Sequence, residues 1–373
     1  MTDLHALPMP KWGMTMTEGT LVDWLVPEGA LVEQGQEIAE VETTKIANAV
    51  EAPVSGILRR QVAVPGASVP VGGLLGVIGD AETTDAEIEA FVSARVSISA
   101  ESDDETPAPR LVETVGGPIN VLSLGGGAGI PVVLLHGYGG DLGSWMFNVD
   151  ALASDRPVYA IDLPGHGASP PRAASELADL AKAVFQVCDA LSAPRVHLVG
   201  HSLGGAVALT IASTKPERAA SLVLVAPVGL GREIEAEYLT AFLAADRRRP
   251  MKQALGLLFS DPDAVSSDMV EGVLRSKRRD GVPQALAATL EGFFDPASGQ
   301  TQELRPALSG FDGPVTVIWG DVDGIIPPAH ADGLPKTSEV HLVPGAGHMP
   351  MMEAASAVNR LLTAHFSSAD RSG

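Results

Sequence analysis

One serine, Ser202, lies in a sequence context in which proteins present a nucleophile. Ser202 is the centre of GHSLG over residues 200–204, with an apolar run before the motif and a small-residue apolar pattern after it. In this strand–turn–helix context, G-x-S-x-G indicates a nucleophile elbow, whose sharp turn exposes the serine hydroxyl above a sheet. Gly200 and Gly204 let the strand and the helix approach closely. A plain glycine-rich turn is the alternative, and the flanking patterns make it the weaker one.

The elements around this turn alternate between strands and helices. Apolar runs predict a hairpin over 110–124 and strands within 131–135, 155–161, 196–200, 221–226, 314–320 and 338–343. Helical spacing predicts helices over 176–191 and 351–366, and a further helix follows the GHSLG turn. Such alternation is typical of a mostly parallel α/β sheet. Residues 228–305 break the rhythm with helical patterns at 233–245, 251–259 and 285–294, which predicts a helical cap.

The order of motifs along this part of the chain is specific. An HG loop, DLPGHGAS, GHSLGG, WGDVDGIIP and GAGHMP follow one another, and with them residues 110–367 resemble the α/β-hydrolase fold. A serine hydroxyl needs a base, and the base needs an acid. The resemblance implies the chain order Ser, acid, His, with His348 as the base. It selects Asp323 as the acid, and Asp321 is the runner-up.

The same resemblance implies an oxyanion hole made of two backbone amides. Leu203 follows the nucleophile and supplies one amide, and Tyr138 follows the HG dipeptide and supplies the other. Three further histidines are expected to have structural roles. His201 should pack under the elbow, His136 should shape the HG loop, and His166 should stabilise its own loop. We predict no metal site.

The first eighty residues contain an internal repeat. Gly19, Gly29 and Gly35 each have a matching glycine 37 positions later, at Gly56, Gly66 and Gly72. Short strands between glycine turns, duplicated once, predict a small two-sheet β domain with pseudo-twofold symmetry. The motif ETTKI lies between the two halves, flanked by alternating strands, so its lysine should lie at the tip of a hairpin. On physical grounds alone, an exposed lysine at a turn is usually a solvated charge.

With these glycines and the ETTK hairpin, residues 4–79 resemble a lipoyl domain, the swinging-arm module of 2-oxo acid dehydrogenase complexes. The resemblance implies that Lys45 carries covalent lipoate. Related biotinyl domains place methionines on both sides of the lysine, whereas Thr44 and Ile46 flank it here. Lipoyl domains usually have aspartate before the lysine, so Thr44 departs from the pattern. We therefore assign residues 1–80 to a lipoyl domain.

Composition limits the partners and the compartment. The chain has 373 residues, a formal charge of −21 and a single cysteine, Cys188. The charge argues against nucleic acid or an anionic membrane as a partner. No intrachain disulfide is possible, and we find neither a secretory signal nor a membrane-spanning run, which favours a cytoplasmic protein. Residues 81–109 contain eight acidic residues and one basic residue. We therefore expect a flexible acidic linker before the domain of residues 110–373.

Together, the two domains narrow the function. A lipoyl arm joined to an acyl-handling site resembles the E2 component family of acetoin dehydrogenase complexes, and the usual H-x-x-x-D-G acyltransferase signature is not found. The resemblance implies acetyl transfer from lipoamide on Lys45 to coenzyme A through Ser202, His348 and Asp323. It also implies a thiamine-dependent E1 and a dihydrolipoamide dehydrogenase E3 as partners, and a homo-oligomer.

Two other functions remain open on the sequence alone. The second domain could be an esterase, thioesterase or carbon–carbon bond hydrolase with an attached lipoyl domain, because a fold does not determine the acyl acceptor. A non-catalytic lipoyl carrier with a scaffolding second domain is the third possibility. The presence of Ser202, Asp323 and His348 in order argues against the third.

Overall fold

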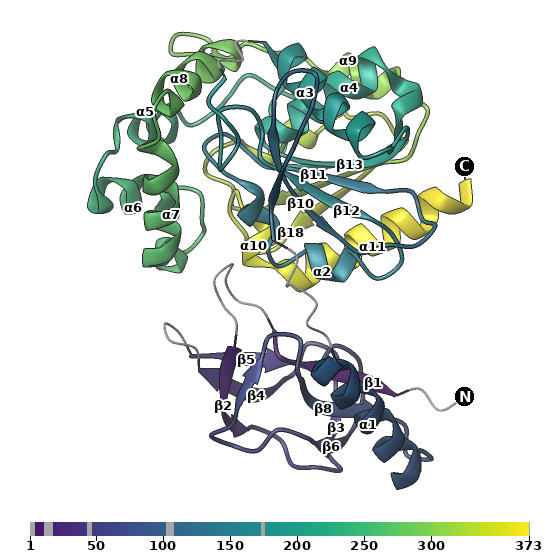
Figure 1. The fold of residues 1–373 in the computed structure, drawn as a ribbon. Helices are drawn as coiled ribbons and strands as arrows, with labels where there is room; N and C mark the ends of the chain where they lie inside the picture. The colour runs from purple at the N-terminus through teal and green to yellow at the C-terminus, as the bar shows by residue number, and fades with distance from the viewer. Residues whose placement is uncertain (1–3, 11–17, 43–46, 102–107, 173–175, 373) are drawn as a thin grey trace. The chain divides into compact units, whose positions relative to one another are not determined.

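The computed structural model describes all residues except 1–3, 11–17, 43–46, 102–107, 173–175 and 373. Its contacts divide the chain into two compact units, Met1–Thr106 and Pro107–Gly373 (Figure 1). Among the helices of the described residues, none combines the length and the apolar character needed to cross a bilayer.

The N-terminal unit is built from two four-stranded sheets. Their strands are β1 (His5–Pro8), β2 (Glu18–Trp24), β3 (Leu31–Val32), β4 (Glu37–Glu42), β5 (Ala47–Glu51), β6 (Gly56–Gln61), β7 (Ser68–Pro70) and β8 (Leu74–Gly79). The strand orders are β1-β8-β6-β3 and β5-β4-β2-β7, and the strands pair antiparallel. Strand β8 begins and ends 37 residues after β4. The repeat read from the glycines therefore relates the strands of the two halves, and each sheet contains two strands from each half. The predicted two-sheet β domain is confirmed.

Apolar side chains that alternate along these strands face the space between the two sheets. Leu21, Ile38 and Val41 from one sheet and Leu58 and Leu75 from the other are all fully buried. Strand β2 thus buries one face and leaves the other partly exposed, whereas β8 is buried from Leu75 to Gly79. The core of the N-terminal unit is complete within its own residues.

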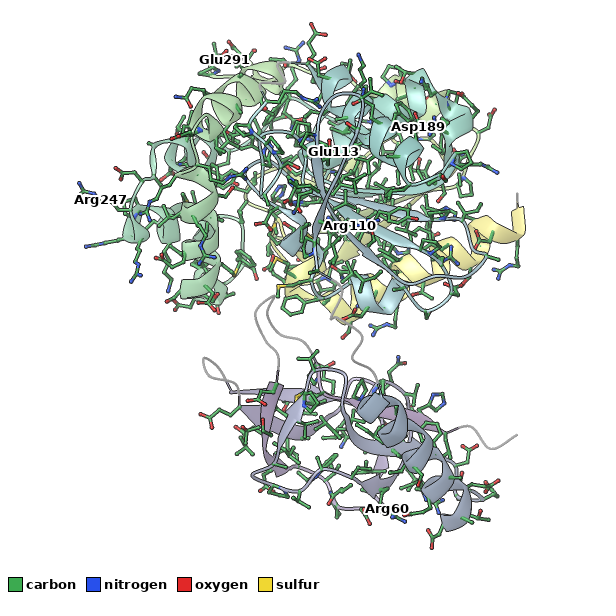
Figure 2. All side chains as sticks on the ribbon, in the orientation of Figure 1. Arg60, Arg110, Glu113, Asp189, Arg247 and Glu291 are labelled. Carbon is green, nitrogen blue, oxygen red and sulfur yellow. The ribbon has the colours of Figure 1, made fainter. Side chains whose placement is uncertain are left out.

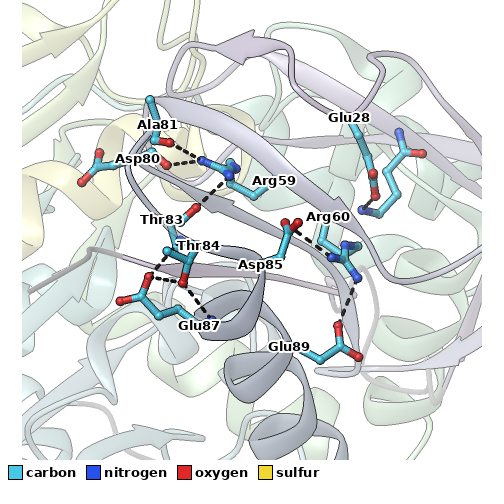
Figure 3. Close-up of polar contacts among 11 residues, drawn as sticks. Glu28, Arg59, Arg60, Asp80, Ala81, Thr83, Thr84, Asp85, Glu87 and Glu89 are labelled. Carbon is cyan, nitrogen blue, oxygen red and sulfur yellow. Dashed lines mark hydrogen bonds and ion pairs between the residues drawn. The ribbon is translucent and has the colours of Figure 1, made fainter.

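A helix inside the acidic segment packs on the N-terminal unit. Helix α1 (Asp85–Glu101) begins at a capping box, in which Thr84 Oγ1 accepts from the Glu87 amide and Glu87 accepts from the Thr84 amide. Arg60 on β6 pairs with Glu89, with 3.2 Å between Nη1 and Oε2, and Ile88 is fully buried (Figure 3). Helix α1 therefore docks on the N-terminal unit. That residues 81–109 form a flexible linker stays a prediction, and residues 102–107 lie outside the described part.

The second unit is organised on an eight-stranded sheet of order β18-β17-β14-β13-β11-β12-β10-β9. The strands are β9 (Arg110–Val112), β10 (Ile119–Leu124), β11 (Val132–Leu135), β12 (Val158–Ile161), β13 (Val196–His201), β14 (Ala219–Val225), β17 (Val315–Gly320) and β18 (Ser338–Val343). The pairs β9–β10 and β10–β12 are antiparallel, and the other pairs are parallel. Every residue of β11, β13 and β14 is buried, because helices cover both faces of the sheet.

Two groups of helices cover the sheet. On one face lie α3 (Leu177–Ala190), α4 (Leu203–Thr214) and α9 (Arg305–Ser309), and on the other α2 (Val149–Leu152), α10 (Pro350–Glu353) and α11 (Ala355–Ser372) (Figure 1). This arrangement confirms the predicted α/β-hydrolase fold with a mostly parallel sheet. The single helix expected over 351–366 is divided into α10 and α11.

The predicted helical cap is also present. It contains α5 (Ala236–Ala244), α6 (Arg248–Gly256), α7 (Ser267–Lys277) and α8 (Val282–Phe293), followed by the short strands β15 (Phe294–Asp295) and β16 (Gly299–Gln300). The sequence pattern missed α7 and the strand pair. Helix α7 begins at Ser266, whose hydroxyl accepts from the Met269 amide, so its N-cap was a usable signal.

A buried polar network fastens the last helix to the sheet. His365 on α11 contacts Ser221 Oγ at 2.7 Å through Nε2 and Thr316 Oγ1 at 2.8 Å through Nδ1. His197 on β13 contacts the same Ser221 oxygen at 2.7 Å and Asp370 at 3.1 Å. Burial lowers the pKa of His365 to about 4, and burial also lowers the pKa of His197. Both rings are therefore packed as neutral groups at pH 7.

This network predicts that acid destabilises the second unit. The pKa of His365 is lower in the folded than in the unfolded protein, so its stabilisation is complete above pH 6.5 and is lost as the pH falls towards about 4. The full loss is on the order of 3 kcal/mol. Calorimetry of the whole chain between pH 7.5 and 5 should show a falling transition temperature for this unit. His365→Gln should have a shallower pH dependence, and an unchanged slope would contradict the assignment.

Candidate active site

Ser202 occupies a strained turn between β13 and α4. Its φ of 52° and ψ of −114° are rare for a residue with a side chain, and its amide donates to the Val225 carbonyl at 2.9 Å. A Cβ on Gly200 would overlap the Gly204 carbonyl, and a Cβ on Gly204 would overlap the Leu135 carbonyl. Only glycine fits at these two positions, so the backbone itself holds the serine at the end of the strand.

His348 and Asp323 meet at the ends of neighbouring strands. Nδ1 of His348 lies 2.8 Å from Oδ2 of Asp323, and both side chains are buried. The other carboxylate oxygen, Oδ1, accepts from the amides of Ile325 and Ile326 at 2.8 and 3.0 Å. The indole N–H of Trp319 donates to Oδ2 at 3.0 Å. The carboxylate is thus fixed by four hydrogen bonds and faces one nitrogen of His348.

Asp321, the alternative acid, lies elsewhere. It is exposed, and its carboxylate accepts from the Gly345 amide at 2.7 Å, which stabilises the turn after β18. Trp319 was not singled out in the sequence. The only signal for it is its place in WGDVD, two residues before Asp321, because no pattern indicates which way an indole nitrogen points.

His201 holds the loop of His348 rather than facing solvent. Its Nε2 donates to the His348 carbonyl at 2.9 Å, and the two rings are 4.7 Å apart between centroids. Burial first, and then the neighbouring His348, lower the pKa of His201 well below its usual value. The ring is therefore neutral. The expectation that His201 packs against the elbow agrees with this position, and its bond to the base loop is an additional function.

The HG loop runs directly beside the nucleophile. A Cβ on Gly137 would lie 3.1 Å from the Cβ of Ser202. Among the described residues, no carbonyl accepts from the next amide, that of Tyr138, which leaves it available as a donor. Leu203 is the first residue of α4, where backbone amides have no partner within the helix. The two amides expected to form the oxyanion hole are therefore both close to Ser202. Leu203 follows Ser202 in the chain, and Tyr138 follows Gly137 in the loop that packs beside it.

His136 fixes the peptide group that carries the Tyr138 amide. Its Nε2 accepts from the Leu163 amide at 3.0 Å, so its Nδ1 donates to the Gly137 carbonyl at 2.8 Å. That carbonyl also accepts from the Gly140 amide at 3.1 Å. Burial lowers the pKa of His136 to about 4, so this tautomer persists at pH 7. His136 shapes the HG loop, as the sequence suggested.

The loop that contains His166 is tied to the HG loop from the other side. Its ring lies 5.2 Å from that of His136, and burial lowers the pKa of His166 to about 3. Asp162 accepts from the Leu142 and Ala168 amides, both at 2.7 Å, and from the side chain of Asn120. These bonds make the surroundings of the HG loop rigid.

Lys45 lies outside the described residues, but its neighbours on both sides are described. Strands β4 and β5 pair antiparallel, with Glu42 opposite Ala47, so residues 43–46 connect the two strands of a hairpin. This is the position that the sequence predicts for a presented lysine.

The geometry is that of acyl-transfer chemistry. A buried carboxylate orients an imidazole, a strained turn presents a hydroxyl, and two amides are available for a developing oxyanion. Comparison with known proteins shows the family to which the chain belongs.

Two family models match the chain. The model described as "alpha/beta hydrolase fold" matches residues 130–355, and the model described as "Biotin-requiring enzyme" matches residues 5–78. Among solved structures, a meta-cleavage product hydrolase from Pseudomonas fluorescens IP01 aligns with a TM-score of 0.62 and 21% identity. The alignment covers 70% of this chain and 98% of the hydrolase. It shows that the second unit shares the fold of that hydrolase.

Two relatives are similar along nearly their whole length. The dihydrolipoyllysine-residue acetyltransferase component of the acetoin cleaving system of Pseudomonas putida is 43% identical over 369 residues, which are 98% of this chain and 99% of the relative. The component of the same name from Cupriavidus necator is 43% identical over 360 residues, 96% of each chain. The chain therefore belongs to the family of dihydrolipoyllysine-residue acetyltransferase components of acetoin cleaving systems, and it joins a lipoyl-type domain to a domain of the α/β-hydrolase fold.

Proposed function

We propose that this protein transfers an acetyl group from a thioester on its own lipoyl domain to coenzyme A, with Ser202, His348 and Asp323 as the catalytic triad. The observation that carries the proposal is the full-length identity of 43% to acetyltransferase components, together with the bonded His348–Asp323 pair beside the elbow. A carrier domain and an acyl-handling site in one chain make transfer efficient, since tethering raises the effective concentration of the cargo.

In the first half-reaction, Ser202 Oγ attacks the carbonyl carbon of the acetyl thioester while His348 takes the hydroxyl proton. The carbon–oxygen bond forms, the carbon–sulfur bond breaks, and the leaving sulfur receives the proton from His348. Asp323 accepts a hydrogen bond from Nδ1 and so keeps Nε2 of His348 as the free base. The amides of Tyr138 and Leu203 stabilise the negative oxygen of the tetrahedral intermediate.

In the second half-reaction, the thiol of coenzyme A takes the place of water. Its sulfur attacks the acetyl carbon on Ser202 and its proton passes to His348. The ester bond to Oγ then breaks, Ser202 regains the proton, and acetyl-coenzyme A is released. The same two amides stabilise the second tetrahedral intermediate, because the carbonyl oxygen does not move.

Lys45 would hold lipoate through an amide on its side-chain nitrogen. The described part of the β4–β5 hairpin fits this role, because a paired antiparallel ladder up to Glu42 and Ala47 leaves a short connection to be presented. When attached, the dithiolane would supply a thiol on ring opening, and this thiol would carry the acyl group as a thioester. We further propose that a thiamine-dependent E1 loads the arm, that a dihydrolipoamide dehydrogenase E3 reoxidises it, and that the protein is a cytoplasmic homo-oligomer.

The lipoyl assignment predicts a defined mass change. Expression with lipoate supplied should add one lipoyl group to the intact mass, and Lys45→Arg should abolish the addition while leaving the fold of both units intact. Lys11→Arg, a lysine of the same unit, is the matched control and should keep the modification. An unmodified wild-type mass, or the mass of a biotin adduct, would contradict the assignment.

The triad predicts strongly non-additive variants. Ser202→Ala should lower the formation of acetyl-coenzyme A from acetyl-dihydrolipoamide by about 10³-fold or more, because the covalent route is lost. His348→Ala should have a similar effect and the double variant little more, since each residue works only through the other. If Ser202→Ala forms acetyl-coenzyme A at a near-normal rate, direct attack by the thiol of coenzyme A, assisted by His348, replaces this mechanism. If acetate dominates at saturating coenzyme A, the protein is a hydrolase.

The two candidate acids should behave differently. Asp323→Asn removes the acceptor that holds Nδ1 of His348, so transfer should fall by on the order of 10³-fold. Asp321→Asn keeps an oxygen for the Gly345 amide and should stay within about twofold of the wild type. Steady-state rates of the two purified variants decide the point, and an equal loss in both would contradict the choice of Asp323.

A further inference from the structure

The cap is bonded to the backbone of the HG loop. The hydroxyl of Tyr238, on α5, donates to the Tyr138 carbonyl at 3.1 Å, and both side chains are buried. The hydroxyl of Tyr138 itself donates to the Leu286 carbonyl on α8, also at 3.1 Å. The residue proposed to supply an oxyanion donor is thus held by two helices of the cap, through its main chain and through its side chain.

The two peptide groups that flank Tyr138 are fixed by different parts of the protein. The group that carries its amide is held from the body of the fold, since the Gly137 carbonyl accepts from His136 and Gly140. The next group is held from the cap, since its carbonyl accepts from Tyr238. The direction of the Tyr138 amide depends on both, because rotation of either peptide group turns the residue between them.

Packing reinforces the hydrogen bond from Tyr238. Gly139 has a φ of +74°, and the ring of Phe242 on α5 fills the space that a side chain there would occupy. The ring of Phe242 also lies 5.7 Å from that of Tyr138 and 5.8 Å from that of Tyr238, and it is fully buried. The three rings therefore pack together around the hydrogen bond.

The end of α5 is itself locked to its neighbour in the cap. The ammonium of Lys277, on α7, donates to the carbonyls of Phe242 and Leu243 in the last turn of α5 and to that of its C-cap residue, Ala245. A cation at this end of a helix also meets the negative end of the helix dipole. In contrast, Arg247 and Glu291 extend from the outer side of the cap into solvent (Figure 2). The inward side of the cap is therefore built to hold α5 in one position.

We propose that the cap completes the oxyanion hole, with Tyr238 as the positioning residue that sets the direction of the Tyr138 amide. This inference rests on two parts of the proposed function, which are Ser202 as the nucleophile and the Tyr138 amide as an oxyanion donor. The site is then fully assembled when α5 is seated, and displacement of α5 withdraws one donor.

The test uses p-nitrophenyl acetate with the full chain and follows the burst of p-nitrophenolate. In this reaction, Ser202 Oγ bonds to the acetyl carbon, p-nitrophenolate leaves, and the serine proton passes to His348. Tyr238→Phe should lower the acylation rate constant about tenfold and leave KM within about twofold, because a donor acting in the transition state is misdirected. Methyl trifluoromethyl ketone, whose adduct with Ser202 carries an oxyanion, should bind about tenfold more weakly to Tyr238→Phe than to the wild type.

Matched variants separate positioning from general damage. Tyr159→Phe removes a hydroxyl from β12 in the same unit and should leave both quantities unchanged. Phe242→Leu keeps the Tyr238 hydroxyl but loosens its packing, and it should weaken acylation and inhibitor binding together. If Tyr238→Phe and Phe242→Leu both retain acylation and inhibitor affinity within twofold, the inference is overturned.

This experiment also distinguishes the inference from the proposed function. Acylation of Ser202 by the ester takes place whether coenzyme A or water is the later acceptor. Failure to form acetyl-coenzyme A in the wild type would therefore refute the transferase proposal and leave the Tyr238 result standing. If the wild type forms acetyl-coenzyme A but Tyr238→Phe leaves the acylation rate unchanged, only the inference is refuted.

Discussion

The active site depends on one close approach of two backbones. Strand β13 and helix α4 touch at Gly200 and Gly204, where no Cβ can be accommodated. The contact forces Ser202 into a conformation that costs free energy, which the fully buried sheet around it must supply. The positions of the other groups are set relative to this turn, because the HG loop packs on Ser202 and His201 bonds to the loop of His348.

What could be predicted from the sequence follows from how local each signal is. The elbow glycines, the strands and the duplicated turns of the first domain are visible because residues close in the chain carry them. The choice of Asp323 and His348 came from resemblance, since nothing in their spacing brings them together; the order of β17 and β18 does. Tyr238 could not have been found, because its partner lies 100 residues earlier and a tyrosine on an amphipathic helix looks like any core residue.

Helix α1 shows a different limit. The acidic composition of residues 81–109 favours disorder, since such a segment has little apolar surface to bury. The helix nevertheless docks, because its Ile88 is fully buried and its Glu89 pairs with Arg60 of β6, in an earlier part of the chain. Around the active site, burial similarly decides roles that composition cannot. It keeps His136, His166 and His201 neutral, so they hold loops in place, whereas His348 faces a carboxylate.

The duplication within the N-terminal unit has a mechanical consequence. Strand β4 ends at Glu42 and leads into the β4–β5 connection, and β8 ends 37 residues later at Gly79 and leads to α1. The two strands hold equivalent places in the repeat but belong to different sheets. A group attached to the β4–β5 connection would therefore be presented from one sheet, while the chain continues from the other.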